Sequence, residues 1–438
     1  MTIKTAPYIT SAIRKFEGMV LKDHKFTLPL DYADEAAGFI EVFAREVVSI
    51  SKEHDESLPW MVFFQGGPGF PSPRPELNSG WVGEALKTHR LILLDQRGTG
   101  LSSRVLPQTL AKFQSPQEQA EYLTHFRADN IVRDAEAIRK TLAGESTKWV
   151  GVGQSYGGFC LLTYLSFYPE GLSGVAITGG VACVLRRAED NYRLTYGKVL
   201  EKNREFYRRY PEHVEGVKKI VSYLSENEVT LPSGGRLSPR RFQALGLAFG
   251  MSSGFERIHY LIEKAFVEGP EGEELSYDFL VGVEQQHAFD TNPIFCILHE
   301  SIYGEGYATN WAAERLREEF PEVAVDTEGP FIFTGEMISP TMLDDFANLR
   351  PFKECAELLA QKEDWGRLYD IEQLGQNTVP VAAISYYADM YVPVELSRET
   401  ADHIPRFYQW VTNEWEHNGI GVDGPKILRT LLNKLEEI

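Results

Sequence analysis

The sequence predicts an α/β protein with a mostly parallel central sheet flanked by helices and an inserted, mainly helical cap domain. Three short apolar runs, each followed by glycine, are typical of buried parallel strands: residues 59–65, 90–95 and 148–152. Residues 130–142, between the second and third runs, carry apolar side chains at helical spacing. Strand, helix and strand therefore alternate, as they do in α/β sheets.

Further strands and helices are predicted at both ends of the chain. Apolar and polar residues alternate over residues 26–32 and 39–48, which predicts two half-buried strands. Strand and helix alternate again near the C-terminus, with strands expected at residues 379–386 and 406–411 and helices at residues 346–362, 394–403 and 425–435. These elements complete the sheet that the apolar runs begin.

The middle of the chain is largely helical and charged, and 438 residues exceed what one compact core usually holds. Helices are predicted at residues 191–210 and 310–320, and residues 232–236 and 269–274 have the glycine and proline content of loops. We therefore expect a helical cap domain inserted after the sixth strand. The predicted division is residues 1–185 for the first part of the core, 186–350 for the cap domain and 351–438 for the second part of the core.

Composition limits the classes of partner. The 44 basic and 63 acidic side chains give a net charge of −19, which repels nucleic acid and anionic membranes. No run of about 18 apolar residues is present, and the first residues lack the apolar stretch of a signal peptide. The four cysteines form no C-x-x-C pair and have no metal-ligand spacing, so we interpret them as free thiols. These features predict a cytoplasmic protein that binds neither nucleic acid nor membranes, and they leave a homo-oligomer open.

The strongest chemical motif is GQSYGG at residues 153–158, directly after a predicted strand. It fits the pattern G-x-S-x-G in the context of strand, sharp turn and helix, which is typical of α/β hydrolases. Ser155 is the predicted nucleophile, held on a strained turn, and the backbone N–H of Tyr156 would point at a developing oxyanion. Because this pattern also occurs by chance, an ordinary glycine-rich turn is the alternative for the motif alone.

Two further motifs follow predicted strands. QGGPG at residues 65–69 brings glycines to the end of an early strand, where backbone amides can approach a substrate closely. We expect the N–H of Gly67 to be the second oxyanion donor, with a plain turn as the alternative. Residues 94–103 (LDQRGTGLSS) are interpreted as a structural loop braced by an aspartate–arginine pair, with no catalytic step.

A serine nucleophile needs a base, and the base needs a carboxylate that orients it. In α/β hydrolases the chain order is serine, acid and histidine. His417 lies in the loop after the last predicted strand and is the predicted base, whereas His403 ends a helix and suits a partner of the helix dipole. Asp389 follows the preceding strand and is the predicted acid, with Glu416 as the competing candidate.

Together, QGGPG, DQRGTGLSS and GQSYGG resemble the motifs HGGPG, DQRGxGxS and GxSxGG of the proline iminopeptidase family of α/β hydrolases. The resemblance covers residues 26–185 and 375–425, with one departure, since Gln65 stands where many members have histidine. It implies an α/β-hydrolase fold with a helical cap. It also implies an activity that removes an N-terminal residue, often proline, from peptides.

The resemblance further implies that glutamates of the cap bind the free ammonium group of the substrate. Glu300, in HESIY, is similar to the E-x-x-Y segment of the family, and Glu336 follows the apolar run PFIF. An ordinary surface charge is the alternative for both. Phe295, Cys296 and Tyr303 could wall a small apolar pocket, although core packing explains them equally well.

The predicted reaction is hydrolysis at the free amino terminus of a short peptide by Ser155, His417 and Asp389 through an acyl-enzyme, with no metal or organic cofactor. An esterase, lactonase or amidase of the same fold is the nearest alternative, which the absence of an ammonium-binding carboxylate would favour. A non-catalytic receptor of the same fold is a second alternative, and the intact set of triad residues argues against it.

Overall fold

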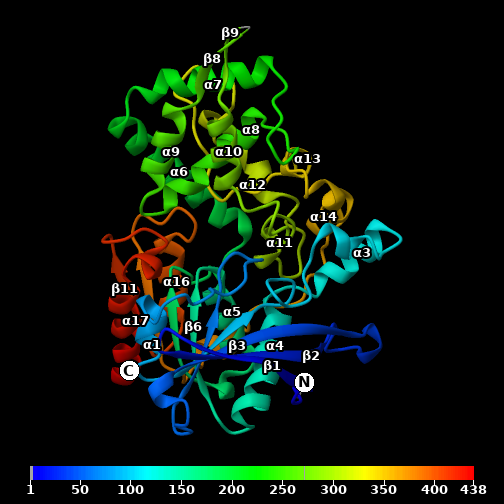
Figure 1. Ribbon diagram of the computed structural model, residues 1–438, viewed down its shortest axis with the longest axis vertical. Coiled ribbons are helices and arrows are strands. Elements are labelled where there is room, and N and C mark those ends of the chain that lie inside the picture. The colour runs from blue at the N-terminus through cyan, green and yellow to red at the C-terminus, as the bar shows by residue number, and fades with distance from the viewer. Residues whose placement is uncertain (1–2, 271) are drawn as a thin grey trace.

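A computed structural model describes residues 3–270 and 272–438 of the protein, and its central feature is a nine-stranded sheet (Figure 1). In spatial order the strands are β1 (Tyr8–Phe16), β2 (Met19–Pro29), β3 (Phe39–Ser49), β5 (Arg90–Asp95), β4 (Trp60–Phe64), β6 (Trp149–Gln154), β7 (Leu172–Thr178), β10 (Val381–Tyr386) and β11 (Phe407–Thr412). Pairing is antiparallel from β1 to β5 and parallel from β5 to β11. The predicted, mostly parallel sheet is confirmed.

Helices cover both faces of this sheet, which explains the continuous apolar runs in its central strands. In β4, Val62 and Phe64 face α4 (Ala128–Ala143) and α5 (Tyr156–Phe167), while Met61 and Phe63 face α1 (Gly80–Ala85) and α17 (Gly419–Glu437). A strand that is buried on both faces has no polar side to alternate with its apolar one. The short helices α2 (Pro107–Leu110) and α3 (Pro116–Thr124) lie between β5 and α4 in the chain, and α16 (Val394–His403) lies between β10 and β11.

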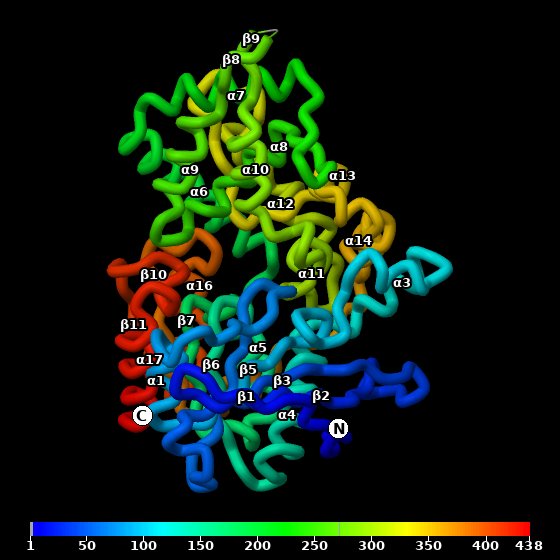
Figure 2. Tube along the Cα trace, viewed as in Figure 1, coloured from blue at the N-terminus to red at the C-terminus, as the bar shows by residue number. Residues whose placement is uncertain are grey.

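Between β7 and β10 the chain forms a large, mainly helical segment, which we call the helical insertion (residues 179–380). Its helices are α6 (Ala188–Arg209), α7 (His213–Glu226), α8 (Pro239–Gln243), α9 (Gly254–Glu263), α10 (Tyr277–Gln286), α11 (Ile294–Ile297), α12 (Ala312–Arg315), α13 (Met342–Asp345), α14 (Lys353–Ala360) and α15 (Ile371–Gly375), with a hairpin of β8 (Phe266–Gly269) and β9 (Gly272–Leu275). Figure 2 shows most of this segment at one end of the molecule and both chain termini toward the other end. Much of it packs round an apolar cluster of its own, which supports the cap domain proposed for residues 186–350.

Short 3₁₀ helices complete the described elements: η1 (Glu35–Ala37), η2 (Ile50–Lys52), η3 (Pro169–Gly171), η4 (Ala244–Gly250), η5 (Glu300–Ile302), η6 (Leu316–Glu319), η7 (Pro321–Val323) and η8 (Arg350–Phe352). The four cysteines are buried free thiols, as predicted. Within the described residues, no helix combines the length and apolar character that crossing a membrane requires.

Several element predictions were wrong in detail. The insertion follows the seventh strand along the chain rather than the sixth, and neither β1 nor β7 was among the five strands predicted before it. β1 is an edge strand whose side chains are almost all exposed, so it has no alternation to detect. Within the predicted loop at residues 269–274, Gly269 belongs to β8 and residues 272–274 belong to β9, while residue 271 lies outside the described residues. The predicted helix at residues 310–320 breaks into α12 and η6.

The ends of two C-terminal helices also differ from prediction. The helix expected at residues 346–362 begins only at Arg350, as η8, and continues as α14 to Ala360. Pro351 has no N–H for a helical bond, so a helix cannot run unbroken from residue 346 through it. The closing helix starts at Gly419, with a kink at Asp423 just before Pro425. Proline lacks the N–H that a helical hydrogen bond needs, so the helical spacing of apolar residues is interrupted there. The sequence pattern therefore indicated a helix only from residue 425.

Candidate active site

Ser155 lies on the sharp turn between β6 and α5. Its backbone has φ 53° and ψ −124°, a strained conformation for a residue with a side chain. The turn is crowded: a Cβ atom at Gly157 would lie 2.0 Å from the carbonyl oxygen of Phe64, and one at Gly153 would lie 2.5 Å from the carbonyl of Gly157. Only glycine fits both places, which is the physical reason for the G-x-S-x-G pattern.

The QGGPG loop packs directly against this turn. A Cβ atom at Gly66 would come within 2.9 Å of Ser155 Cβ, so the loop and the serine are in contact. Gly67 has φ 126°, a conformation that favours glycine. Tyr156 is the first residue of α5, so its N–H has no carbonyl one turn earlier in the helix to pair with. Both predicted oxyanion donors therefore belong to segments that meet at Ser155.

His417 and Asp389 form a buried hydrogen-bonded pair. His417 Nδ1 lies 2.7 Å from Asp389 Oδ2, and the two residues are 4% and 1% exposed. The other carboxylate oxygen, Oδ1, accepts the N–H groups of Tyr391 at 2.9 Å and Val392 at 3.1 Å. Burial by itself would lower the pKa of His417, but the charge and hydrogen bond of Asp389 outweigh it and the pKa lies above its usual value. Asp389 thus orients His417 and stabilises its protonated form.

Two glycines after β7 bring the serine turn next to the histidine. A Cβ atom at Gly180 would lie 2.0 Å from the carbonyl oxygen of Ser155, and one at Gly179 would lie 3.3 Å from His417 Nδ1. Among the described residues, Ser155 Oγ makes no hydrogen bond, and such bonds to the base are often long when no substrate is bound. Ser155, Asp389 and His417 follow β6, β10 and β11, so they gather where the parallel strands end, as ligand sites of α/β sheets do.

The two predicted ammonium-binding glutamates have different surroundings. Glu300 accepts the N–H groups of Ala312 at 2.8 Å and Ala313 at 2.9 Å, one on each carboxylate oxygen, at the start of α12. Burial raises its pKa to about 7. Its oxygens are therefore committed to a helix terminus, and the structure does not bring it into contact with the His417–Asp389 pair.

Glu336 instead lies close to the histidine and the aspartate. Its pKa is raised to about 8 by burial and by the nearby charge of Asp389, while His417 acts in the opposite direction. Its Oε2 is 3.8 Å from His299 Nε2, but burial lowers the pKa of His299 to about 3, so the imidazole is neutral and the contact is not an ion pair. Glu336 is 20% exposed and has no cationic partner among the described residues, so this carboxylate can receive a positive group.

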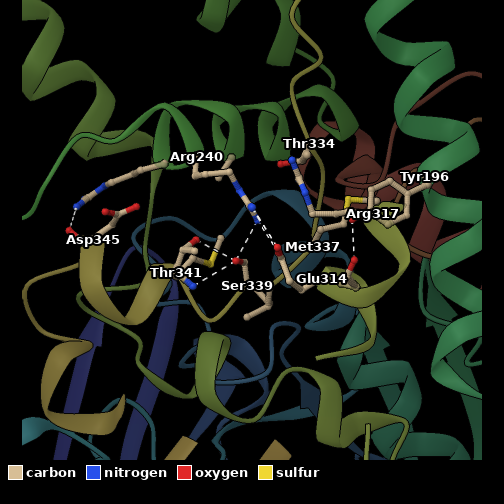
Figure 3. A pocket seen from close by; sticks show the side chains of 14 residues that line it. Tyr196, Arg240, Glu314, Arg317, Thr334, Met337, Ser339, Thr341 and Asp345 are labelled. Atoms are coloured by element: carbon tan, nitrogen blue, oxygen red, sulfur yellow. Dashed lines mark hydrogen bonds and ion pairs between the residues drawn. The ribbon is translucent and has the colours of Figure 1, made fainter. Parts of the chain in front are cut away.

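A polar network behind Glu336 holds the segment that carries it. Figure 3 shows Arg240 reaching both Glu314 and Ser339 in a small pocket that Met337 and Thr334 also line. Arg240 donates to the Glu314 carboxylate at 3.0 and 2.5 Å and to Ser339 Oγ at 3.1 Å. Because these groups form hydrogen bonds with one another, we interpret this pocket as structural support for residues 334–339.

The helical insertion also holds the histidine loop, by contacts that the sequence did not predict. The N–H of His417 donates to the carbonyl oxygen of Gly250 at 3.1 Å, and Lys202 Nζ in α6 donates to Glu416 Oε1 at 2.6 Å. Asn418 Oδ1 accepts both the N–H and the hydroxyl of Ser252, at 3.0 and 2.9 Å. Glu416, the competing acid, is thus engaged with Lys202, and the position of the histidine depends on both parts of the chain.

The DQRGTGLSS loop is structural, but its ion pairs differ from the predicted internal brace. Arg97 forms a buried bidentate pair with Asp134 of α4, at 2.7 and 2.6 Å. Asp95 instead accepts Arg74 and the N–H of Leu101. The loop is therefore anchored to a helix and to the segment after QGGPG.

Comparison with known proteins agrees with this geometry. A family model described as "alpha/beta hydrolase fold" matches residues 59–244. The chain is 48% identical to a proline iminopeptidase of Aeromonas sobria over 95% of this chain and 96% of that protein. It is 35% identical to the proline iminopeptidase aneH of Aspergillus aculeatus over 94% and 93% of the two chains. The crystal structure of proline iminopeptidase from Mycobacterium smegmatis is 16% identical, with a TM-score of 0.44 and coverage of 94% and 98%. At such identity to curated relatives over nearly its whole length, the chain belongs to the proline iminopeptidase family of α/β hydrolases and is a serine hydrolase of the aminopeptidase type.

Proposed function

We propose that this enzyme releases an N-terminal residue, preferentially proline, from short peptides through a Ser155–His417–Asp389 triad. One observation carries the proposal: the carboxylate of Glu336 lies in the same buried region as the His417–Asp389 pair. A negative charge at that point favours binding of a substrate whose positive amino terminus is next to the scissile bond. The names of the two curated relatives support proline as the preferred first residue.

In the proposed mechanism Ser155 attacks the first carbonyl of the peptide while His417 takes the serine proton. Asp389 holds the imidazole by its 2.7 Å bond and stabilises the imidazolium. The N–H groups of Gly67 and Tyr156 bind the oxyanion. His417 then protonates the leaving amine, and water releases the first residue from the acyl-enzyme.

Glu336 supplies the specificity for a free amino group in this proposal. With a pKa of about 8 the empty site holds a largely protonated carboxyl at neutral pH. An ammonium group beside it favours the charged form, so its pKa falls and substrate binding releases a proton. A blocked amino terminus offers no such charge and leaves the carboxyl neutral.

We propose that Phe295 and His299 of the insertion line the pocket for the first residue. Gly69 of the QGGPG loop packs against Phe295, because a Cβ atom there would lie 2.9 Å from the Phe295 nitrogen. The rings of Phe295 and His299 are 5.6 Å apart, and His299 contacts Glu336. A compact apolar ring such as that of proline suits a wall of this kind.

The test is release of a chromophore from proline, alanine and leucine arylamides, each with a free and with an acetylated amino group. We expect turnover of the free amines alone, fastest for proline, because only they place a cation beside Glu336. Equal turnover of the acetylated forms, or turnover of simple esters alone, would leave a general esterase or amidase of the same fold.

Lys202 is a positioning residue in this mechanism. Replacing it tests whether contacts from the helical insertion keep His417 in place. Lys202→Met leaves the half-buried Glu416 carboxylate without its cation, next to the base. Because burial already raises the pKa of Glu416, the loss of Lys202 disturbs the histidine loop. We expect kcat on proline arylamide to fall about tenfold with a smaller change in KM, as for a group that acts on transition-state geometry.

Rescue separates positioning from simple destabilisation. Lys202→Arg restores the charge and should recover most of kcat, whereas Lys198→Met removes a lysine of the same helix that pairs with Glu395 and should have little effect. A pH profile of kcat identical in Lys202→Met and the unaltered enzyme, with kcat unchanged, would refute the positioning role.

A further inference from the structure

Two histidines of the helical insertion, 46 residues apart in sequence, face each other: His213 of α7 and His259 of α9. His213 Nε2 and His259 Nδ1 are 2.7 Å apart and share one hydrogen bond. Glu212, the residue before His213, places Oε1 4.0 Å from His259 Nδ1. One donor atom from each of the three residues lies within 4.8 Å of the others. The triad uses none of them.

The surroundings hold both imidazoles in place. The ring of Tyr210 stacks on His259 with centroids 4.1 Å apart and an interplanar angle of 11°. Phe206 stacks on His213 at 5.8 Å and 18°. His213 is buried, His259 is half-buried and Glu212 is exposed, so the donor atoms lie at the surface end of a packed pair of helices. A site held in this way is preorganised yet open to an ion from solvent.

A second carboxylate supports one of the rings. Glu263 Oε1 lies 3.3 Å from His259 Nε2, the nitrogen that does not face His213. A carboxylate on the far nitrogen fixes the tautomer of a metal-ligating histidine and makes it a better donor.

We propose that His213, His259 and Glu212 form a zinc-binding site that joins α7 to α9. Two imidazole nitrogens and one carboxylate oxygen suit Zn²⁺, with water as the fourth tetrahedral ligand, better than they suit Ca²⁺ or Mg²⁺. Zinc at its usual 2.0–2.1 Å from nitrogen needs the two ring nitrogens about 3.3 Å apart, a small opening of the present contact. The ion takes the place of the shared proton.

The structure also indicates what such a site does. Phe206, His213 and Phe255 belong to the contacts that join α6, α7 and α9 round the apolar cluster of the insertion. A metal that bridges α7 and α9 therefore stabilises this packing and takes no part in the chemistry at Ser155. The readouts are accordingly zinc affinity and stability, independent of whether the enzyme is active.

The experiment uses the full chain, treated with chelator and dialysed, then titrated with zinc chloride by calorimetry in buffers of different ionisation enthalpy. We expect one tightly bound zinc per chain, proton release on binding and a higher melting temperature with zinc. Cobalt(II) in place of zinc should give the visible absorption of a tetrahedral site. His259→Gln keeps a hydrogen bond to His213 but removes a ligand, and it should abolish this binding event.

If His259→Gln folds poorly, two other variants test the zinc site. Glu212→Gln changes an exposed side chain and should weaken zinc binding, and Glu263→Gln should weaken it roughly tenfold through the supporting contact. His54→Gln is the matched control, since His54 also lies beside a glutamate, 3.9 Å from Glu53, but has no second histidine. Absence of stoichiometric zinc, or equal affinity in the His259→Gln and unaltered chains, would overturn the site.

Discussion

Replacing Ser155 by alanine is expected to lower kcat on proline arylamide by about 10⁴-fold or more, while the protein stays folded. In the proposed mechanism the acyl-enzyme route disappears with the hydroxyl, and neither His417 nor the proposed oxyanion donors can replace a nucleophile. Steady-state release of the chromophore, compared with melting curves of both proteins, is the measurement.

Backbone strain gives this prediction a second readout. Ser155 has φ 53° and ψ −124°, which glycine adopts without cost, so Ser155→Gly should be as inactive as Ser155→Ala but more stable by about 1 kcal/mol. Ser222→Ala, at an exposed serine of α7 whose hydroxyl donates to Glu226, is the control and should behave as the unaltered enzyme. Activity of Ser155→Ala above about 1% would show that another residue attacks the substrate.

Replacing Glu336 by glutamine is expected to lower kcat/KM for free-amine substrates by about 10²-fold or more. Glutamine keeps the size of the side chain but removes the charge that faces the ammonium group, and losing one partner of a buried charge pair costs about 2–5 kcal/mol. Turnover of acetylated substrates, already small, should not fall further. The ratio of free to acetylated kcat/KM is therefore the quantity to measure.

The pH dependence follows from the raised pKa of Glu336. Its carboxyl is protonated below a pH of about 8, so kcat/KM for free amines should rise as the pH increases toward that value. In Glu336→Gln this rise in kcat/KM should disappear, and only the pH dependence caused by ionisation of His417 should remain.

Glu300→Gln is the matched control, because Glu300 is another glutamate of the insertion whose pKa is raised by burial. Its oxygens accept the N–H groups at the start of α12, so we expect a loss of stability with an unchanged free-to-acetylated ratio. The opposite outcome, discrimination lost in Glu300→Gln and kept in Glu336→Gln, would assign the ammonium site to Glu300.

The serine turn could be predicted because its cause is local. Gly153 and Gly157 are needed where the chain turns from β6 into α5, and a turn of this kind leaves a pattern within five residues. Asp389 and His417 could be predicted for a related reason. Each follows its own strand, and parallel strands bring their carboxyl ends to one edge, so strand order alone predicts their meeting.

No comparable rule predicts which residues of the helical insertion meet, because its helices are not ordered by a shared sheet. Glu300 and Glu336 look alike in sequence, yet Glu300 caps α12 and Glu336 lies near enough to the His417–Asp389 pair for their charges to shift its pKa. Their different surroundings depend on the direction in which each segment faces after the helices pack. Long-range contacts and burial decide that direction.

The sequence by itself therefore determined most of the sheet, the serine turn and the residues that follow its strands, because backbone sterics and apolar periodicity act over a few residues. Only the tertiary structure decided which glutamate faces His417, that Lys202 holds Glu416, and that His213 and His259 meet. Such pairs join residues that are far apart in the chain, and their energies arise from desolvation and charge once packing has brought them together.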